Sequence, residues 1–263
     1  MPASELPTPD SSAPEQPPPA VSVVLPIYNE ERTLGPTFEA LVPFLEQLEI
    51  PGAAAPNFEV IGVDDGSLDG SAKLLKELAE RHAFVRVISL PENRGKGAAV
   101  RAGMLAATGN FSIFMDADLS TPLEEIPRVL GALESGYDVV LGNRRSPGSH
   151  VTRRQPKVRE FFGRGFTLIT RIFLVPGVQD FTCGFKGFTR NAAQAVFERS
   201  TLNGWAFDAE LVVIAHVQGL KLVQVPVLWR HEDDTKVRLI SAITGSLIDL
   251  FRIFIARLQG RYR

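Results

Sequence analysis

At residues 111–125 the chain reads FSIFMDADLSTPLEE. The apolar run 111–115 predicts a buried strand, and on an extended segment Asp116 and Asp118 would point to the same side. Two carboxylates on one side can close on a hard cation, and the carboxyl end of a buried strand is where open α/β sheets place their ligands. We therefore predict a metal site here, with an Asp-rich turn as the alternative.

A helix is expected directly after this motif. Thr121 would be its N-cap, Pro122 its first residue and Glu124 the capping-box partner. The helix would then run to Leu133, and this order of strand, turn and helix is one step of an α/β fold.

The same alternation extends along the first half of the chain. The apolar runs predict strands at 21–26, 58–63, 85–88, 111–115 and 138–141, and the helical patterns lie at 29–48, 71–81, 97–107 and 122–133. Pro36 and Pro43 should delay or kink the first helix. The order indicates an α/β fold with a mainly parallel sheet flanked by helices on both faces.

The second half is less regular. Residues 143–160 are polar and basic, 161–175 form an amphipathic helix candidate and 185–188 an edge-strand candidate. A helix at 207–218, a strand at 220–227 and a last helix at 239–258 follow.

Composition limits the classes of protein to consider. The chain has 263 residues, 44% of them hydrophobic and 22% charged, which suits one large domain with or without an appendage. A net charge of −2 argues against nucleic-acid binding driven by overall charge. The single cysteine, Cys183, excludes an intramolecular disulfide and suits a reducing compartment. Residues 1–20 have the composition of a disordered Pro-rich tail, not of a signal peptide or membrane anchor.

Polar clusters follow successive predicted strands. They are Tyr28-Asn29-Glu30, Asp64-Asp65-Gly66-Ser67, Asn93-Arg94-Gly95-Lys96-Gly97, Asp116-Ala117-Asp118 and Asn143-Arg144-Arg145. Each alone could be a turn, but five at one edge of a sheet describe a polar cleft. The sequence has neither a P-loop nor a dinucleotide-binding glycine motif after the first strand. The turn 93–97 offers cations and backbone N–H groups to a diphosphate.

These motifs, in this order, resemble the family 2 glycosyltransferases, which have a GT-A (Rossmann-like) fold. Downstream segments resemble the polyprenyl-phosphate sugar synthases, with the dolichyl-phosphate beta-glucosyltransferase branch nearest. Those segments are Gly142–Arg145, Arg153–Pro156, Asp180–Lys186 and Gly204–Leu211. The resemblance covers about 21–258 and divides the chain into a glycosyltransferase domain at 21–238 and a C-terminal amphipathic helix at 239–263. Within the domain, 21–142 would be the nucleotide-sugar half and 143–238 the acceptor half.

The resemblance implies inverting transfer of a hexose from a nucleoside diphosphate sugar to a polyprenyl (dolichyl or undecaprenyl) phosphate at a membrane surface. UDP-glucose is the favoured donor. The alternatives are a GDP-mannose-dependent mannosyltransferase, a GT-A enzyme with a soluble acceptor, and a sugar-nucleotide-binding or scaffolding protein without turnover. The oligomeric state is not predicted.

The resemblance also assigns roles on the donor side. Asp116 and Asp118 would hold a divalent metal, Mg²⁺ or Mn²⁺, with Ser120 at a position where relatives often carry a glutamine ligand. The nucleotide sugar would be bound by Pro26, Tyr28, Glu30, Asp64, Asp65, Lys96, Lys236 and Arg238. For Tyr28, simple packing over the end of the sheet is an equal alternative.

On the acceptor side, the family's phosphate-gripping arginines match Arg144, Arg145 and Arg159. A phosphate monoester already carries close to two negative charges, so it needs positioning cations more than a general base. The residues expected in catalysis are Asp116, Asp118, Arg144, Arg159 and Asp208, with Asp208 orienting arginines or the sugar. Arg153, Arg154 and Lys157 would either decorate a loop or face a membrane.

A lipid acceptor requires access to a bilayer. The candidate helices at 161–175 and 239–258 each carry an apolar face flanked by arginines, which is typical of interfacial helices. The alternative is that both faces pack on the core. The expected location is cytoplasmic, with peripheral association at the cytoplasmic face of a membrane.

Overall fold

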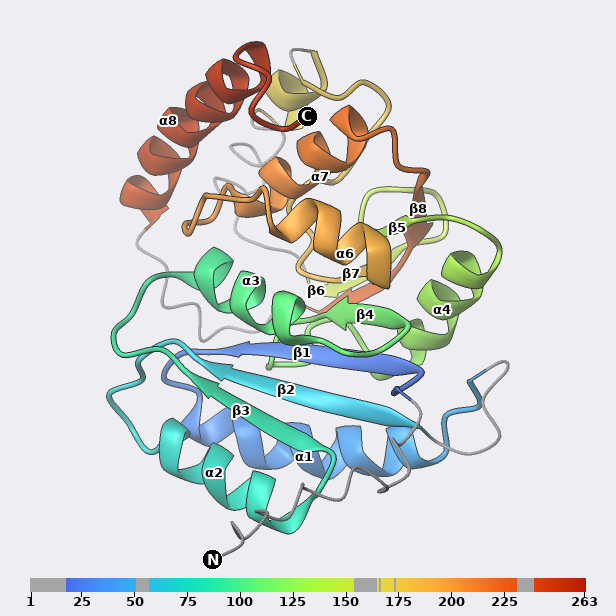
Figure 1. The fold of residues 1–263 in the computed structure, drawn as a ribbon, viewed down its shortest axis with the longest axis vertical. Helices are drawn as coiled ribbons and strands as arrows, with labels where there is room; N and C mark the ends of the chain where they lie inside the picture. Colours follow the sequence, from blue (N-terminus) through green and yellow to red (C-terminus); the bar gives the residue numbers. More distant parts are fainter. Residues whose placement is uncertain (1–17, 51–56, 154–164, 166, 173, 231–238) are drawn as a thin grey trace, which may run out of the picture.

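A seven-stranded sheet organises the computed structural model, which describes residues 18–50, 57–153, 165, 167–172, 174–230 and 239–263. The strand order is β3-β2-β1-β4-β7-β5-β8 (Figure 1). The strands are β1 (Val21–Ile27), β2 (Phe58–Asp64), β3 (Val85–Ser89), β4 (Phe111–Phe114), β5 (Val139–Asn143), β7 (Lys186–Thr189) and β8 (Leu222–Pro226). Two further strands, β6 (His150–Arg153) and β9 (Leu228–Arg230), pair with each other.

The sheet is mainly parallel, as predicted. β1 pairs in parallel with both β2 and β4, β2 with β3, and β5 with β8. The prediction of an edge strand at 185–188 was wrong, because β7 lies between β4 and β5 and is antiparallel to both. Lys186 and Phe188 are buried on one face, and Gly187 is buried on the other face beside Val129 of a covering helix, which suits an interior strand covered on both faces.

Helices cover both faces of the sheet (Figure 1). The first face packs against α1 (Glu31–Glu46), α2 (Ser71–Arg81) and α4 (Ile126–Glu134). The second packs against α3 (Lys96–Ala106), α6 (Arg190–Phe197) and α7 (Phe207–Val217), with α8 (Leu239–Leu258) beside α7. In β1 the alternation is direct, since Val23 and Leu25 belong to the first core and Val24 to the second.

Two details of the predicted helices were wrong. Helix α1 runs unbroken from Glu31 to Glu46 with both prolines inside it, so the late start is not observed. The helix buries an apolar face that includes Leu34, Phe38, Leu41 and Leu45. The free energy gained by this burial exceeds the cost of the backbone hydrogen bonds that the prolines cannot donate.

The helix after the carboxylate motif also begins later than expected. A 3₁₀ turn spans Leu123–Glu125, and α4 begins at Ile126. Pro122 is extended (ψ 151°) and precedes the 3₁₀ turn, so it is not the first helical residue as predicted, and the N-cap position of α4 is Glu125 and not Thr121. The buried Glu125 carboxylate instead forms an ion pair with Arg128, at 3.0 Å, and accepts a hydrogen bond from the Leu228 backbone N–H, also at 3.0 Å.

The C-terminal half exposes apolar side chains. On α8, Ile248 is 56% and Phe251 65% exposed, whereas Ile253 is buried. Residues 167–172 are helical, and there Ile172 is 65% exposed while Thr170 is buried. The rest of the helix expected at 161–175 lies largely outside the described residues. No helix in the described part of the chain combines the length and the apolar character needed to cross a bilayer.

Candidate active site

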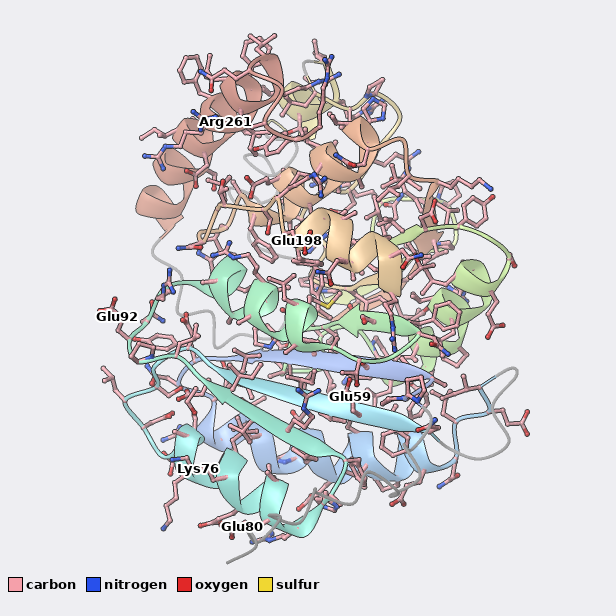
Figure 2. All side chains as sticks on the ribbon, in the orientation of Figure 1. Glu59, Lys76, Glu80, Glu92, Glu198 and Arg261 are labelled. Carbon is pink, nitrogen blue, oxygen red and sulfur yellow. The ribbon has the colours of Figure 1, made fainter. Side chains whose placement is uncertain are left out.

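The polar clusters meet at one edge of the sheet, because the carboxyl ends of parallel strands coincide. In the register, Ile27 of β1 pairs with Asp64 of β2, and Asp64 pairs with Ser89 of β3. Figure 2 shows Glu92, in the loop after β3, at this edge, whereas Glu59 lies nearer the opposite edge. The loops that follow β1, β2, β3, β4 and β5 therefore lie at one edge of the sheet, as predicted.

The loops after β1 and β2 are bound to each other. The Asn29 backbone N–H donates to the Ser67 hydroxyl at 3.0 Å, and the Leu68 N–H donates to Asn29 Oδ1 at 2.7 Å. Asn29 adopts a left-handed conformation (φ 56°) that an asparagine tolerates. Tyr28 is 36% exposed beside this junction, where the sequence places the nucleoside.

The predicted nucleoside residues Glu30 and Asp64 also carry structural hydrogen bonds. The Glu30 carboxylate accepts from the Thr33 hydroxyl at 2.7 Å, and Asp64 Oδ1 accepts from the Ser67 N–H at 3.0 Å. Pro26 is half-buried within β1. Contact of these residues with a nucleotide remains a prediction.

Asp65 holds the next loop in place. Its buried carboxylate accepts from the Asn93 amide at 3.0 Å and from the backbone N–H groups of Arg94 and Gly95 at 2.8 Å each. Burial raises the pKa of Asp65, with a smaller contribution from the charge of Asp64. Asp65 thereby fixes the turn from which α3 and Lys96 begin.

Lys96 and the carboxylate motif form the centre of the donor side. The Lys96 ammonium donates to Asp116 Oδ1. Burial opposes the charge on Lys96, but the negative charges of Asp116 and Asp208 outweigh it and raise the lysine pKa. Desolvation raises the pKa of Asp118, and the charge of Asp116 adds to the effect. The two predicted carboxylates are thus close enough to repel each other.

The turn that carries these carboxylates is constrained on several sides. Leu119 has a positive φ of 51°, which is strained for a leucine, and the Ser120 N–H donates to Asp118 Oδ1 at 2.9 Å. The Thr37 hydroxyl of α1 donates to the Ala117 carbonyl at 2.5 Å. A Cβ on Gly184 would lie 2.5 Å from Asp116 Oδ2, so the chain approaches this carboxylate closely where only glycine fits.

The donor atoms suit a divalent metal. Asp116 and Asp118 supply hard oxygen atoms whose mutual repulsion a cation would relieve. The described residues contain no group of three or more His, Cys, Asp or Glu side chains arranged to hold a metal. A magnesium-type ion is typically held by one or two carboxylates, with water and substrate phosphates completing its shell.

Arg144 lies directly after β5, which β7 separates from β4 in the sheet. Its Nε donates to Asp180 Oδ2 at 2.7 Å, and its Nη2 donates to Asp180 Oδ1 at 2.9 Å and to the Thr182 hydroxyl at 3.0 Å. Asp180 is fully buried, and although burial alone would raise its pKa, the charge and hydrogen bonds of Arg144 hold that pKa well below its usual range. The Arg144 guanidinium therefore has a fixed orientation.

Arg145 is more peripheral than the sequence suggested. It is exposed, and its Nη1 donates to the Thr167 hydroxyl at 2.6 Å and to the Gln179 carbonyl at 3.2 Å. Its backbone N–H donates to Asn143 Oδ1 at 2.8 Å. Its role with an acceptor phosphate remains a prediction.

Asp208, in the first turn of α7, is neutralised by a lysine that the sequence-based site did not include. Lys186 of β7 is fully buried and donates to Asp208 Oδ1 and, at 2.6 Å, to the Cys183 carbonyl. The signal was a lysine inside the apolar run Phe185–Phe188, because a buried charge requires a partner. The negative charge of Asp208 also contributes to raising the pKa of Lys96 and of Arg144. The two cations are therefore coupled electrostatically to the same carboxylate.

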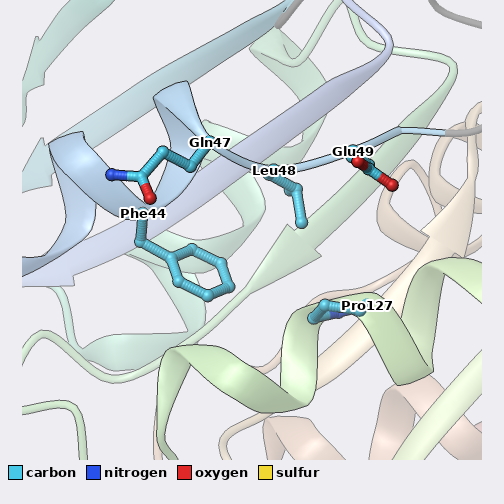
Figure 3. Close-up of a pocket in the computed structure, with 5 residues that line it drawn as sticks. All are labelled: Phe44, Gln47, Leu48, Glu49 and Pro127. Carbon is cyan, nitrogen blue, oxygen red and sulfur yellow. The ribbon is translucent and has the colours of Figure 1, made fainter.

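Other predicted residues cannot be placed. Arg159, Lys236 and Arg238 lie outside the described residues, as do Arg154 and Lys157. A shallow hollow between the end of α1 and α4 is lined by Phe44, Gln47, Leu48, Glu49 and Pro127 (Figure 3). It contains none of the side chains discussed above, so the candidate site remains the group of charged side chains at the carboxyl edge of the sheet.

The chain is similar to known proteins over most of its length. Residues 22–197 match the model of the family described as glycosyl transferase family 2. The dolichyl-phosphate beta-glucosyltransferase ALG5C of Trichomonas vaginalis is 36% identical over 240 residues, which cover 88% of this chain and 70% of that protein. The dolichyl-phosphate beta-glucosyltransferase of Drosophila melanogaster is 35% identical over 257 residues, which cover 92% of this chain and 77% of that protein.

A solved structure shows the same fold. The glucosyl-3-phosphoglycerate synthase of Mycobacterium tuberculosis, crystallised with Mn²⁺ and UDP-glucose, matches with a TM-score of 0.63 and 22% identity. The match covers 92% of this chain and 79% of that one. The expected GT-A fold is thereby confirmed.

Proposed function

The chain belongs to glycosyl transferase family 2, and on that premise we propose that it transfers glucose from UDP-glucose to the phosphate of a polyprenyl lipid. The relatives named dolichyl-phosphate beta-glucosyltransferases support both the sugar and the class of acceptor. The observation that carries the proposal is that the Lys96–Asp116 pair and the Arg144–Asp180 pair both lie within reach of the charge of Asp208.

On the donor side, Asp116 and Asp118 would hold Mg²⁺ or Mn²⁺, with Ser120, water and diphosphate oxygens as further ligands. When bound, this ion offsets the charge that develops on the departing diphosphate. The Lys96 ammonium, held on the Asp116 carboxylate, adds a second positive charge next to the same group. Tyr28, Glu30 and Asp64 would bind the nucleoside, and their place at the ends of β1 and β2 supports this assignment.

On the acceptor side, a phosphate oxygen of the lipid forms the new bond to the anomeric carbon. The bond from that carbon to the diphosphate oxygen breaks, and its electron pair leaves with the nucleoside diphosphate. The phosphate carries close to two negative charges near neutral pH, so no proton has to be removed. Arg144 would orient this phosphate, because its guanidinium is already fixed by Asp180.

Asp208 fits this chemistry as an orienting group and not as a general base. Its carboxylate is buried and held by the Lys186 ammonium, so it is not available to accept a proton from an acceptor. Cys183 has no nucleophilic role either, because burial raises the pKa of its thiol to about 11.

We propose further that the exposed apolar side chains of α8 and of residues 167–172 lie in the interface of a membrane. The two segments adjoin, since Arg257 of α8 donates to the Leu174 carbonyl. Their exposed side chains include Leu168, Ile172, Ile248, Phe251 and Leu258, with arginines between them. Apolar faces flanked by basic residues favour binding at a lipid surface.

One assay tests the proposal. The purified chain is mixed with vesicles that contain polyprenyl phosphate and is offered labelled UDP-glucose or GDP-mannose, with and without Mn²⁺; 3-phosphoglycerate serves as the soluble acceptor. We expect lipid-linked glucose that forms only with UDP-glucose and metal. Transfer from GDP-mannose alone would support the mannosyltransferase alternative. Transfer to the soluble acceptor alone would overturn the lipid assignment.

Metal binding can be tested separately with Asp118→Asn. Desolvation and the negative charge of Asp116 both raise the pKa of Asp118, so its ionised form is unfavourable in the folded chain. The substitution should therefore not lower the midpoint of thermal unfolding in the absence of metal. Mn²⁺ should raise the midpoint of the wild-type chain and leave that of the variant unchanged. Equal stabilisation of both proteins by Mn²⁺ would place the metal elsewhere.

A further inference from the structure

The chain contains two tryptophans, and each lies over a cation of the candidate site. The Lys96 Nζ is 5.7 Å from the centre of the Trp205 ring, and the Arg144 Cζ is 5.3 Å from the centre of the Trp229 ring. Both distances fall within the range of cation–π attraction. The tryptophans come from different elements, so the arrangement is not a consequence of sequence spacing.

Trp229 completes the fixation of Arg144. Asp180 and Thr182 take the Nε and Nη2 edge of the guanidinium, and Trp229 of β9 lies over the group. Within the described part of the chain, no protein acceptor is bound to Nη1 of Arg144. One edge of the guanidinium is thus hydrogen-bonded, and one of its faces is covered by Trp229. Nη1 is left as the donor that an incoming anion can reach.

Trp205 has the corresponding position on the donor side. It is 46% exposed, in the loop before α7, and that loop is packed tightly on the turn that carries Lys96. The Gly97 N–H donates to the Asn203 carbonyl at 2.8 Å, and a Cβ on Gly95 would lie 2.5 Å from the same oxygen. The ring is therefore held next to the ammonium that lies on Asp116.

We propose that the two tryptophans are positioning residues, one for each substrate: Trp229 holds Arg144 for the acceptor phosphate, and Trp205 holds Lys96 for the donor diphosphate. The assignment of substrates to the two sides rests on the proposed function. The physical reason is that an aromatic face restrains a cation without neutralising it, whereas a second carboxylate would repel the anionic substrate.

Kinetics of four variants test whether each tryptophan affects the binding of one substrate only. Trp229→Leu should raise the KM for polyprenyl phosphate about fivefold or more, from the usual strength of a partly desolvated cation–π contact, and should leave the KM for UDP-glucose within about twofold. Trp205→Leu should show the reverse pattern. Trp229→Phe and Trp205→Phe keep an aromatic face and should recover most of each loss. A leucine variant that changes both KM values equally, or a phenylalanine variant no better than leucine, would overturn the proposal.

Fluorescence tests the same inference without turnover. Trp205→Phe leaves Trp229 as the only tryptophan, and Trp229→Phe leaves Trp205, so that excitation at the red edge of the absorption band reports one indole at a time. Inorganic phosphate should change the emission of Trp229 alone, and UDP with Mn²⁺ that of Trp205 alone. Emission that follows the wrong ligand, or no ligand, contradicts the inference even if the wild-type chain transfers glucose. The expected emission pattern in a chain that transfers no sugar would refute the proposed function only.

Discussion

Gly184 shows how strongly a single residue can constrain the site, because a Cβ there would approach Asp116 Oδ2 to 2.5 Å. Asp116 in turn carries the Lys96 ammonium, and Asp180 carries the Arg144 guanidinium. At this scale the charged groups expected to touch substrate are each oriented by a second residue. Of these second residues, Gly184 is a glycine and Asp180 is fully buried, whereas the Asp116 side chain is 31% exposed.

Gly184→Ala should therefore displace the Asp116 carboxylate and reduce glucose transfer by about tenfold or more, since small misplacements in a site carry large costs. Metal titration of the variant should show weaker Mn²⁺ binding. Gly131→Ala is the matched control, because a Cβ there meets nothing within 4 Å and the site lies inside helix α4. Full activity in Gly184→Ala would mean that the Asp116 position is not critical.

The Arg144–Asp180 pair predicts a pH dependence of stability. The folded-state pKa of Asp180 lies below its unfolded value of about 3.9, so the pair contributes stability above that pH and loses it as the pH falls. In urea unfolding between about pH 5 and pH 2, Asp180→Asn should show a flatter loss of unfolding free energy than the wild-type chain. The exposed control Glu77→Gln should follow the wild-type slope. Parallel slopes for all three proteins would refute the role of Asp180.

Sequence reasoning located the residues that carry charge at strand ends but not the residues that hold them. Asp116, Asp118, Lys96 and Arg144 stand out because polar side chains directly follow apolar strands. Asp180 and Trp229 gain their roles only from contacts across more than thirty positions of the chain, and no local pattern encodes such contacts.

At the scale of secondary-structure elements, β7 is the piece that joins the two halves of the site. It lies between β4, which carries the Asp116 motif, and β5, which leads to Arg144. Its position could not be read from a four-residue apolar run, because an interior antiparallel strand and an edge strand have the same local pattern. The parallel strands were easier to predict, since each alternates with a helix of clear periodicity.

Lys186 anchors β7 to α7, and its loss should be costly. Lys186→Met leaves the buried Asp208 carboxylate without its partner, so we expect the free energy of unfolding to fall by about 3–5 kcal/mol. The double variant Lys186→Met/Asp208→Leu should recover much of that loss, as measured by urea unfolding. Additive losses in the double variant would show that the pair is not coupled.

Helix α8 predicts a membrane-binding phenotype. Replacing the exposed Ile248 and Phe251 with serine should reduce flotation with anionic vesicles and leave the thermal midpoint unchanged, because neither side chain is part of the core. Tyr137→Ser, an exposed aromatic residue in the turn before β5, should float like the wild-type chain. Unchanged flotation of the Ile248/Phe251 variant would leave these side chains without a membrane role.

At the scale of the whole molecule, the sheet brings two groups of charged side chains, Asp116 with Lys96 and Arg144 with Asp180, to one edge. The carboxylate motif and Lys96 suit a diphosphate that departs, and Arg144 suits a phosphate that arrives. Among the residues that the structure describes, Asp208 is paired with Lys186 and is not free to act as a base. This arrangement favours direct displacement by an acceptor that is already charged, with inversion at the sugar.

The configuration of the product tests this account most directly. The purified chain is incubated with Mn²⁺, UDP-glucose and a short-chain polyprenyl phosphate, and the anomeric linkage of the product is read by NMR. Direct displacement predicts a β-linked glucosyl phosphate and no transfer to the corresponding polyprenol, which lacks the phosphate. An α-linked product, or equal transfer to the alcohol, would contradict it.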